Sequence, residues 1–148
     1  MASITETLVS DHAVFIGVFG WIKQVLPRLT TLGEVKLLAG LVEALLRDHA
    51  DVETDLAFIA VDHALYNKGQ LNRLHEDHDE IDDRLKQVQT AANLSDARRL
   101  LRLALLASRQ HFRREERIIF PLIEKVLQKE TLTKLGGVRM RQYLARGR

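Results

Sequence analysis

Cysteine is absent from the 148 residues of the chain, and this absence narrows the chemistry that the protein can perform. Disulfides, thiolate nucleophiles, iron–sulfur clusters and cysteine-based zinc sites are all excluded. Any bound metal must therefore be held by imidazole and carboxylate groups, which suit iron, manganese or zinc. Proline is scarce, at two residues, and the chain has no Asn-Gly or Asp-Gly pair, which argues against an all-β fold.

Long apolar runs are missing too. No stretch approaches the roughly 18 apolar residues of a membrane span. The N-terminus carries Glu6 and Asp11 and lacks the basic and then apolar pattern of a signal peptide. We therefore expect no membrane contact and a cytoplasmic location. The formal net charge of +2 is too small to indicate a nucleic-acid partner.

Two amphipathic helices are expected in the first half of the chain. The first begins near Ser3 or Thr5 and ends before Pro27, because the residue that precedes a proline disfavours helix. The second opens at Thr31, with Glu34 three residues later in the pattern of a capping box. It extends to about residue 63, and apolar residues at steps of three and four predict an inward stripe that continues to residue 59.

Two further helices are expected in the second half. A loop over 65–70 separates the second helix from a third at roughly 70–91. Asn93 or Ser95 caps the fourth, in which Pro121 should kink or loosen the helix. His63 falls near the end of the second helix, where a surface histidine is the simplest interpretation.

The expected fold is all-α, an antiparallel up-down-up-down four-helix bundle with a short C-terminal helical segment. At this length we predict one domain over residues 1–148, with the bundle at about 5–127 and an extension at about 128–148. The extension should hold a short helix from about Thr131, interrupted at Gly136 and Gly137.

Four histidines lie on the apolar stripes, one on each helix. They are His12, His49, His78 and His111. Helices rise by about 1.5 Å per residue. On neighbouring helices, the distances from each histidine to the loop that connects the two helices agree to within about one helical turn. An antiparallel bundle therefore brings all four histidines to one level. Glu53 and Glu115 follow His49 and His111 by four residues, which places each carboxylate on the same helical face as its imidazole.

These side chains predict a buried metal site. Unpaired histidines and glutamates in a core cost roughly several kcal/mol per group unless something compensates them. A carboxylate beside an imidazole on each of two helices can bridge two metal ions. A metal-free His–Glu hydrogen-bond network is the structural alternative. The Glu-x-x-His motif of ferritin-like proteins and the His-Glu-x-x-His motif of zinc hydrolases are both absent.

Over roughly residues 5–127 the chain resembles the hemerythrin-like, or HHE cation-binding, domains. Four segments carry the resemblance: Asp11-His12, His49-Ala-Asp-Val-Glu53, Glu76-Asp-His78 with Ile81, and His111-Phe-Arg-Arg-Glu-Glu-Arg-Ile-Ile-Phe-Pro-Leu122. The resemblance implies a four-helix bundle with two non-haem iron ions and a bridging oxo or hydroxo group. It further implies terminal ligands and bridging carboxylates, which by position are His12, His49, His78 and His111, and Glu53 and Glu115.

The chain departs from the pattern of hemerythrins at two points. In place of His-x-x-x-His on the third helix it has His75 and His78, so His75 is either a fifth imidazole ligand or a solvent-edge histidine. In place of His-x-x-x-x-Asp it has Glu115 at i+4 and Glu116 at i+5. We favour Glu115 as the bridge because it shares the face of His111, and Glu116 is the alternative.

The leading functional hypothesis is a di-iron protein that binds, stores or senses O₂, NO or iron. Five imidazoles, two bridging carboxylates and an oxo group would fill about eleven of roughly twelve positions on two six-coordinate ions, so at least one stays open. A peroxidase or catalase-like enzyme acting on peroxide at the same centre is one alternative. A metal-free structural or partner-binding bundle is another. The sequence does not decide whether the protein is an enzyme, or its oligomeric state.

The basic tail at 138–148 has two interpretations. We expect a solvated helix that covers one end of the bundle, with contact to an acidic partner or nucleic acid as the alternative. Tyr143 in this tail could donate a hydrogen bond to a group behind the metal ligands, but we favour ordinary packing.

Overall fold

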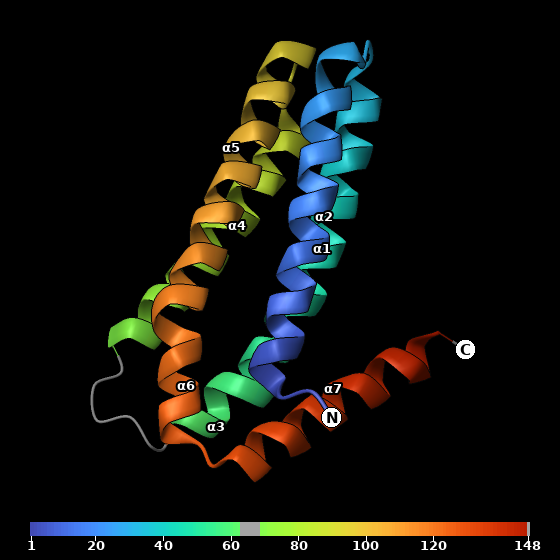
Figure 1. The fold of residues 1–148 in the computed structure, drawn as a ribbon. Helices are drawn as coiled ribbons and strands as arrows, with labels where there is room; N and C mark the ends of the chain where they lie inside the picture. The colour runs from blue at the N-terminus through green and yellow to red at the C-terminus, as the bar shows by residue number, and fades with distance from the viewer. Residues whose placement is uncertain (63–68, 148) are drawn as a thin grey trace.

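The computed structural model describes residues 1–62 and 69–147, and every regular element in these two ranges is helical. Figure 1 shows long helical rods lying along one another, with a last helix across one end. The rods contain α1 (Ile4–Val25), α2 (Leu32–Val52), α4 (Gly69–Thr90) and α5 (Leu94–Arg114), and the last helix is α7 (Lys129–Arg146). The expected all-α class is confirmed. His63 and most of the expected loop at 65–70 lie outside the described residues.

The rods start where the sequence predicts. Ser3 caps α1 and Thr31 caps α2, and in both the glutamate three residues later closes the capping box. The Asn93 side chain accepts a hydrogen bond from the backbone N–H of Asp96 at 2.9 Å and caps α5. After α1, a short 3₁₀ turn, η1 (Leu26–Arg28), contains Pro27.

Two rods widen into π-helical turns partway along. The second continues from α2 through η2 (Glu53–Phe58) into α3 (Ile59–Asp62), and the fourth continues from α5 through η3 (Glu115–Ile119) into α6 (Phe120–Val126). The expected irregularity near Pro121 is therefore a wider turn just before it. Single π turns inside α-helices are frequent at functional sites, and each of these turns begins at a glutamate.

The π turn η2 corrects one sequence expectation. A regular helix would place Ile59 inward, but Ile59 is 52% exposed and Phe58 is 2% exposed. The wider turn shifts the helical register, so the residue before the expected one enters the core.

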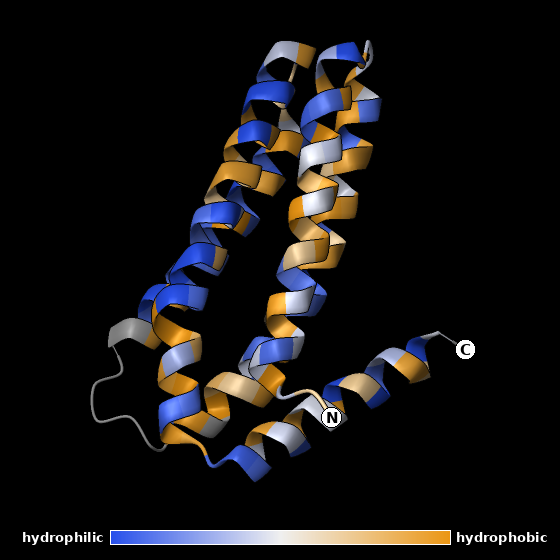
Figure 2. Cartoon of the chain, in the orientation of Figure 1, coloured by the Kyte–Doolittle hydropathy of each residue, from blue (hydrophilic) through white to orange (hydrophobic). Residues whose placement is uncertain are grey.

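The apolar core is divided into two clusters by a polar layer. The upper cluster holds Phe15, Phe19 and Ile22 of α1, and the lower one holds Ile4 and Leu8 of the same helix. Asp11 and His12 lie between these sets of residues along α1. Figure 2 shows hydrophobic and hydrophilic residues alternating along the rods, as expected for amphipathic helices.

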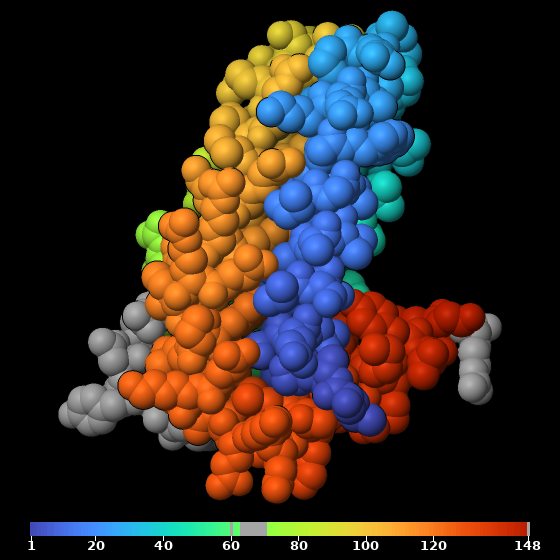
Figure 3. All heavy atoms as spheres, in the orientation of Figure 1, coloured from blue at the N-terminus to red at the C-terminus, as the bar shows by residue number. Residues whose placement is uncertain are grey.

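The C-terminal segment is a single helix, and the interruption expected at Gly136-Gly137 is wrong. A Cβ on Gly136 would lie 2.2 Å from the carbonyl oxygen of Ala2. The glycine therefore allows α7 to pass close to the start of the chain, and Figure 3 shows the two in contact. Leu132 of α7 is buried in the lower cluster. None of the helices in the described ranges combines the length and apolarity needed to cross a membrane.

Candidate metal centre

Six side chains converge in the polar layer, from all four rods. They form two groups of four: His12, His49, Glu53 and Glu115, and then Glu53, His78, His111 and Glu115. In each group, one ligand atom from each side chain lies within 4.8 Å of all the others. Both glutamates belong to both groups. The geometry is therefore that of two neighbouring positions, each faced by two imidazoles, which share two carboxylates.

Glu53 faces both positions with different oxygens. Its Oε1 lies 2.7 Å from Nε2 of His49, and its Oε2 lies 3.2 Å from Nε2 of His78. Glu115 Oε1 lies 2.7 Å from Nε2 of His111 and 3.8 Å from Nε2 of His12. A carboxylate that reaches two sites in this way is suited to bridging.

The imidazoles of each pair also converge. The Nε2 atoms of His12 and His49 are 3.0 Å apart, and those of His78 and His111 are 2.8 Å apart. All four therefore direct Nε2 into the centre. Imidazole nitrogen and carboxylate oxygen together form a donor set that suits iron, manganese or zinc.

The two glutamates are fully buried, at 0% exposed. All four oxygens of Glu53 and Glu115 lack a hydrogen-bond partner among the described residues. The nearby imidazole nitrogens approach as close as 2.7 Å, but without the alignment of a hydrogen bond. Buried carboxylates without hydrogen bonds cost roughly several kcal/mol each. Cations between the two groups would remove that cost, so the residues fit a two-metal site.

The side chains of the centre shift one another's protonation in opposite directions. Burial and the negative charge of Glu53 raise the pKa of Glu115 well above its usual value. Burial alone would raise the pKa of Glu53, but the charge of His49 outweighs it and holds that pKa well below the usual range. Burial likewise opposes protonation of His49, yet Glu53 and Asp11 raise its pKa to about 9. Burial and the charge of His78 lower the pKa of His111 to about 4. Such shifts gather at functional sites.

Carboxylates hold two of the imidazoles from behind. His49 Nδ1 lies 3.1 Å from Asp11 Oδ2, and His111 Nδ1 lies 3.1 Å from Asp77 Oδ2. An Nδ1–H that donates to a carboxylate orients the ring and leaves Nε2 as the metal-binding atom. Sequence reasoning missed both aspartates. A signal was present: His12, His49 and His78 each directly follow an aspartate.

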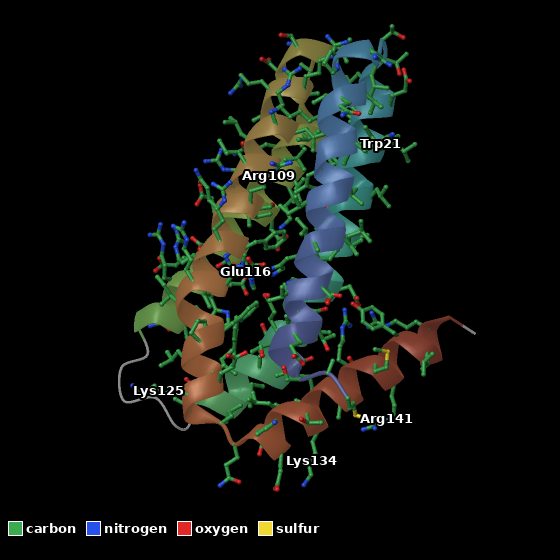
Figure 4. The ribbon with its side chains drawn as sticks, in the orientation of Figure 1. Trp21, Arg109, Glu116, Lys125, Lys134 and Arg141 are labelled. Atoms are coloured by element: carbon green, nitrogen blue, oxygen red, sulfur yellow. The ribbon has the colours of Figure 1, made fainter. Side chains whose placement is uncertain are left out.

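Glu116, the alternative bridge, does not lie between the two groups as Glu115 does. Its side chain is 41% exposed, and its Oε1 lies 3.0 Å from Nδ1 of His12 (Figure 4). It therefore contacts the outer nitrogen of an imidazole and belongs to neither group of four. The geometry favours Glu115 as the shared carboxylate.

His75 is not brought into either group. It is exposed, and its ring centre lies 6.5 Å from that of His78 and 6.0 Å from that of Phe58. It lines a cavity of about 200 Å³ between α2 and α4, whose wall also includes His49, His78 and His111. The structure therefore places His75 beside a route to the centre.

Phenylalanines enclose the other side of the centre. The His12 ring stacks on Phe112 with 4.1 Å between ring centres, and Phe120 stacks at 5.5 Å. Phe15 meets the His49 ring edge-on at 5.2 Å. These contacts cover the two imidazoles with aromatic rings.

Asp11 is held in turn by α7. The Tyr143 hydroxyl donates to Asp11 Oδ1, and Arg139 Nη2 lies 3.3 Å from Asp11 Oδ2. Burial and the Asp11 charge raise the pKa of Tyr143 to about 12, so the hydroxyl keeps the proton that it donates. Ordinary packing, the interpretation that we favoured for Tyr143, is wrong, and the hydrogen-bonding alternative is confirmed. The tail covers one end of the bundle, as expected.

Comparison with known proteins gives a match at the level of the family. A family model described as the Hemerythrin HHE cation binding domain matches residues 3–123. We found no match to the chain among the curated proteins or among the solved structures. The matched range contains all six converging side chains, whereas α7 lies beyond it.

Proposed function

Because the chain belongs to the hemerythrin HHE cation-binding domain family, we propose that its centre holds two non-haem iron ions and binds a small ligand such as O₂, NO or peroxide. One ion is assigned to His12 and His49 and the other to His78 and His111, with Glu53, Glu115 and an oxo or hydroxo group as bridges. The observation that carries this proposal is the set of four buried carboxylate oxygens that lack a partner among the described residues.

The same proposal includes the domain bounds and the order of the helices. Residues 1–148 make one hemerythrin-like domain, and the rods follow one another in up-down-up-down order. The support is that donor groups from all four rods reach one level, as the offsets in an antiparallel bundle require. The cytoplasmic location stays a prediction.

Iron at this centre would supply reversible redox chemistry and open coordination positions. The protein's own residues do the rest. Asp11 and Asp77 orient the imidazoles of His49 and His111 through their Nδ1 atoms. The phenylalanine rings cover one side of the centre, and the cavity lined by His49, His78 and His111 admits a ligand on the other. Four imidazoles, two carboxylates and one bridge fill about ten of roughly twelve positions, which leaves about two for a ligand.

Metal content and optical spectra test the proposal together. The purified protein should contain two irons per chain, and the reduced protein mixed with air in a stopped-flow instrument should develop the absorption of an oxo-bridged di-iron centre. A His75→Ala variant is a suitable control, because His75 lies outside both groups of four. Absence of iron after expression in iron-rich medium, with no such absorption, would exclude the proposal.

Peroxide turnover is the second candidate, and the cavity supports it. An enzyme of this kind needs access for peroxide and a group that carries protons. The cavity supplies access, and the exposed His75 on its wall carries an imidazole, a group that can accept and donate protons. Oxygen-electrode measurements after addition of H₂O₂ separate this activity from simple ligand binding. Turnover no faster than that of free iron would rule it out.

A further inference from the structure

The C-terminal helix reaches the back of the centre although it lies beyond the residues that match the family. It is anchored at Leu132, which is buried in the lower cluster, and at Gly136, which passes close to the backbone of Ala2. From there α7 runs across the end of the bundle, next to the first turns of α1 (Figure 1).

One face of α7 carries three polar groups at helical spacing. Arg139, Tyr143 and Arg146 lie at i, i+4 and i+7, and therefore on the same side of the helix. The first two contact Asp11 of α1, and Arg146 forms an ion pair with Asp48 of α2. The two aspartates directly precede His12 and His49.

Arg139 is the unusual member of this face, because it is only 1% exposed. Its Nη2 lies 2.8 Å from the Tyr143 oxygen, 3.3 Å from Asp11 Oδ2 and 3.4 Å from Asp48 Oδ2. Its guanidinium carbon lies 3.9 Å from the centre of the Tyr143 ring. Its Nε and Nη1 have no hydrogen-bond partner among the described residues. A buried ion pair with incomplete hydrogen bonding is a poor source of stability, so another role must account for it.

Both oxygens of Asp11 are occupied. Oδ1 accepts from Tyr143, while Oδ2 faces both His49 Nδ1 and Arg139. A carboxylate held at both oxygens cannot rotate, and the direction of its bond to Nδ1 sets the direction in which the His49 ring points Nε2. The chain of contacts therefore runs from α7 to Asp11, to His49 and into the centre.

We propose that Arg139 and Tyr143 are positioning residues for the metal centre, and that they act on His49 by fixing Asp11. This inference rests on the proposed function, because it requires that His49 binds a metal. It makes α7 part of the site, although no α7 side chain belongs to either group of four.

A comparison of Asp77 with Asp11 shows what α7 contributes to the site. Asp77 is also paired with arginine, through Arg114 of α5 and Arg73 one turn earlier on α4. Both arginines belong to the bundle itself, so the rods alone support the carboxylate behind His111. Behind His49, the same support comes from α7.

The test uses the full chain loaded with Fe(II) or, for spectroscopy, with Co(II). The variants are Arg139→Gln and Tyr143→Phe, and the matched control is Arg141→Gln on the same helix. Arg141 is exposed and lies on the side of α7 that faces away from α1 (Figure 4). Iron affinity is measured by competition with a chromogenic chelator, the ligand-field spectrum reports the coordination geometry, and thermal unfolding of the metal-free protein reports stability.

Arg139→Gln and Tyr143→Phe should each weaken iron binding by about 10-fold, the lower end of the range for groups behind metal ligands. Both should alter the Co(II) spectrum, and Arg141→Gln should do neither. If the Arg139→Gln variant unfolds, the Tyr143→Phe variant still tests the inference, because it loses only a hydroxyl and should remain folded. Unchanged affinity and spectra in a wild-type background that binds iron would overturn this inference alone. A wild-type protein that binds no metal would instead overturn the proposed function.

Discussion

The two halves of the centre are built from the same parts but are enclosed differently. In the first half, His12 and His49 are both 2% exposed and pack against phenylalanine rings. In the second, the His78 side chain is 16% exposed and lines the cavity between α2 and α4. Under the proposed function, this difference predicts that a small ligand reaches the centre on the side of His78.

The carboxylates behind the two halves differ in the same way. Asp11 is contacted by Tyr143 and Arg139 of α7, and Arg139 is buried. Asp77 lines a second, smaller cavity of about 120 Å³ with Arg73 and Arg114. The two carboxylates are similarly exposed, at 11% for the Asp11 side chain and 9% for that of Asp77, so the difference lies in what surrounds them.

The largest effect is expected where the two halves meet. Glu115→Gln removes a carboxylate that both positions share, so iron affinity should fall by more than about 100-fold, above the range for groups behind the ligands. Glu130→Gln is the control, since Glu130 is exposed and lies outside both groups. Iron titration followed by metal analysis measures the iron affinity of the variant and of the control. Two tightly bound irons in Glu115→Gln would contradict the shared-carboxylate geometry.

The aspartates provide the next largest effect and the sharpest contrast between the halves. Asp11→Asn should weaken iron binding near the upper end, and Asp77→Asn near the lower end, of the roughly 10- to 100-fold range for such groups. The reason is that Asp77 lines a cavity in which water can replace part of the lost contact, whereas Asp11 is held by Arg139 and Tyr143 of α7. Competition with a chelator measures the iron affinity of both variants and gives the ratio of the two losses. Equal losses, or a larger loss for Asp77→Asn, would show that the enclosure by α7 has no influence.

A change in the cavity should affect ligand binding and spare the metal. Ala50→Phe narrows the cavity and should slow binding of NO or azide by about 10-fold, a change within the usual spread of association rates. Ala44→Phe on the same helix is the control, because Ala44 is exposed and does not line the cavity. Stopped-flow mixing measures the rates, with iron content checked in parallel. Unaltered rates in Ala50→Phe would mean that the ligand enters elsewhere.

The smallest effect concerns His75. Because His75 lies outside both groups of four, His75→Ala should keep two irons per chain and an unchanged spectrum. His78→Ala, three residues along the same helix, is the comparison and should lose iron from the open half. Loss of iron in His75→Ala would restore the fifth-imidazole role expected from the resemblance.

The parts of the fold that sequence could predict depend on local signals. Capping residues marked the starts of three rods, at Ser3, Thr31 and Asn93, because the caps satisfy N–H groups that the helix itself leaves free. The convergence of the four histidines followed from helical rise and short connections alone. Both inferences use geometry that neighbouring residues determine.

The parts that sequence could not predict depend on contacts between distant residues. The π turns at Glu53 and Glu115 shift the register without a local signal, which is why Ile59 was assigned to the wrong face. Gly136 reads as a helix breaker, but it is a point of close approach to Ala2. Asp11 bonds to the histidine of a neighbouring helix instead of its own sequence neighbour, and only the packed bundle shows this.

Diffraction from crystals of the iron-loaded protein at the iron absorption edge tests the central claim most directly. We predict two anomalous peaks between Glu53 and Glu115, one bonded to Nε2 of His12 and His49 and the other to Nε2 of His78 and His111. The absence of iron from the layer between the two apolar clusters, or a single ion held by other side chains, would contradict this account.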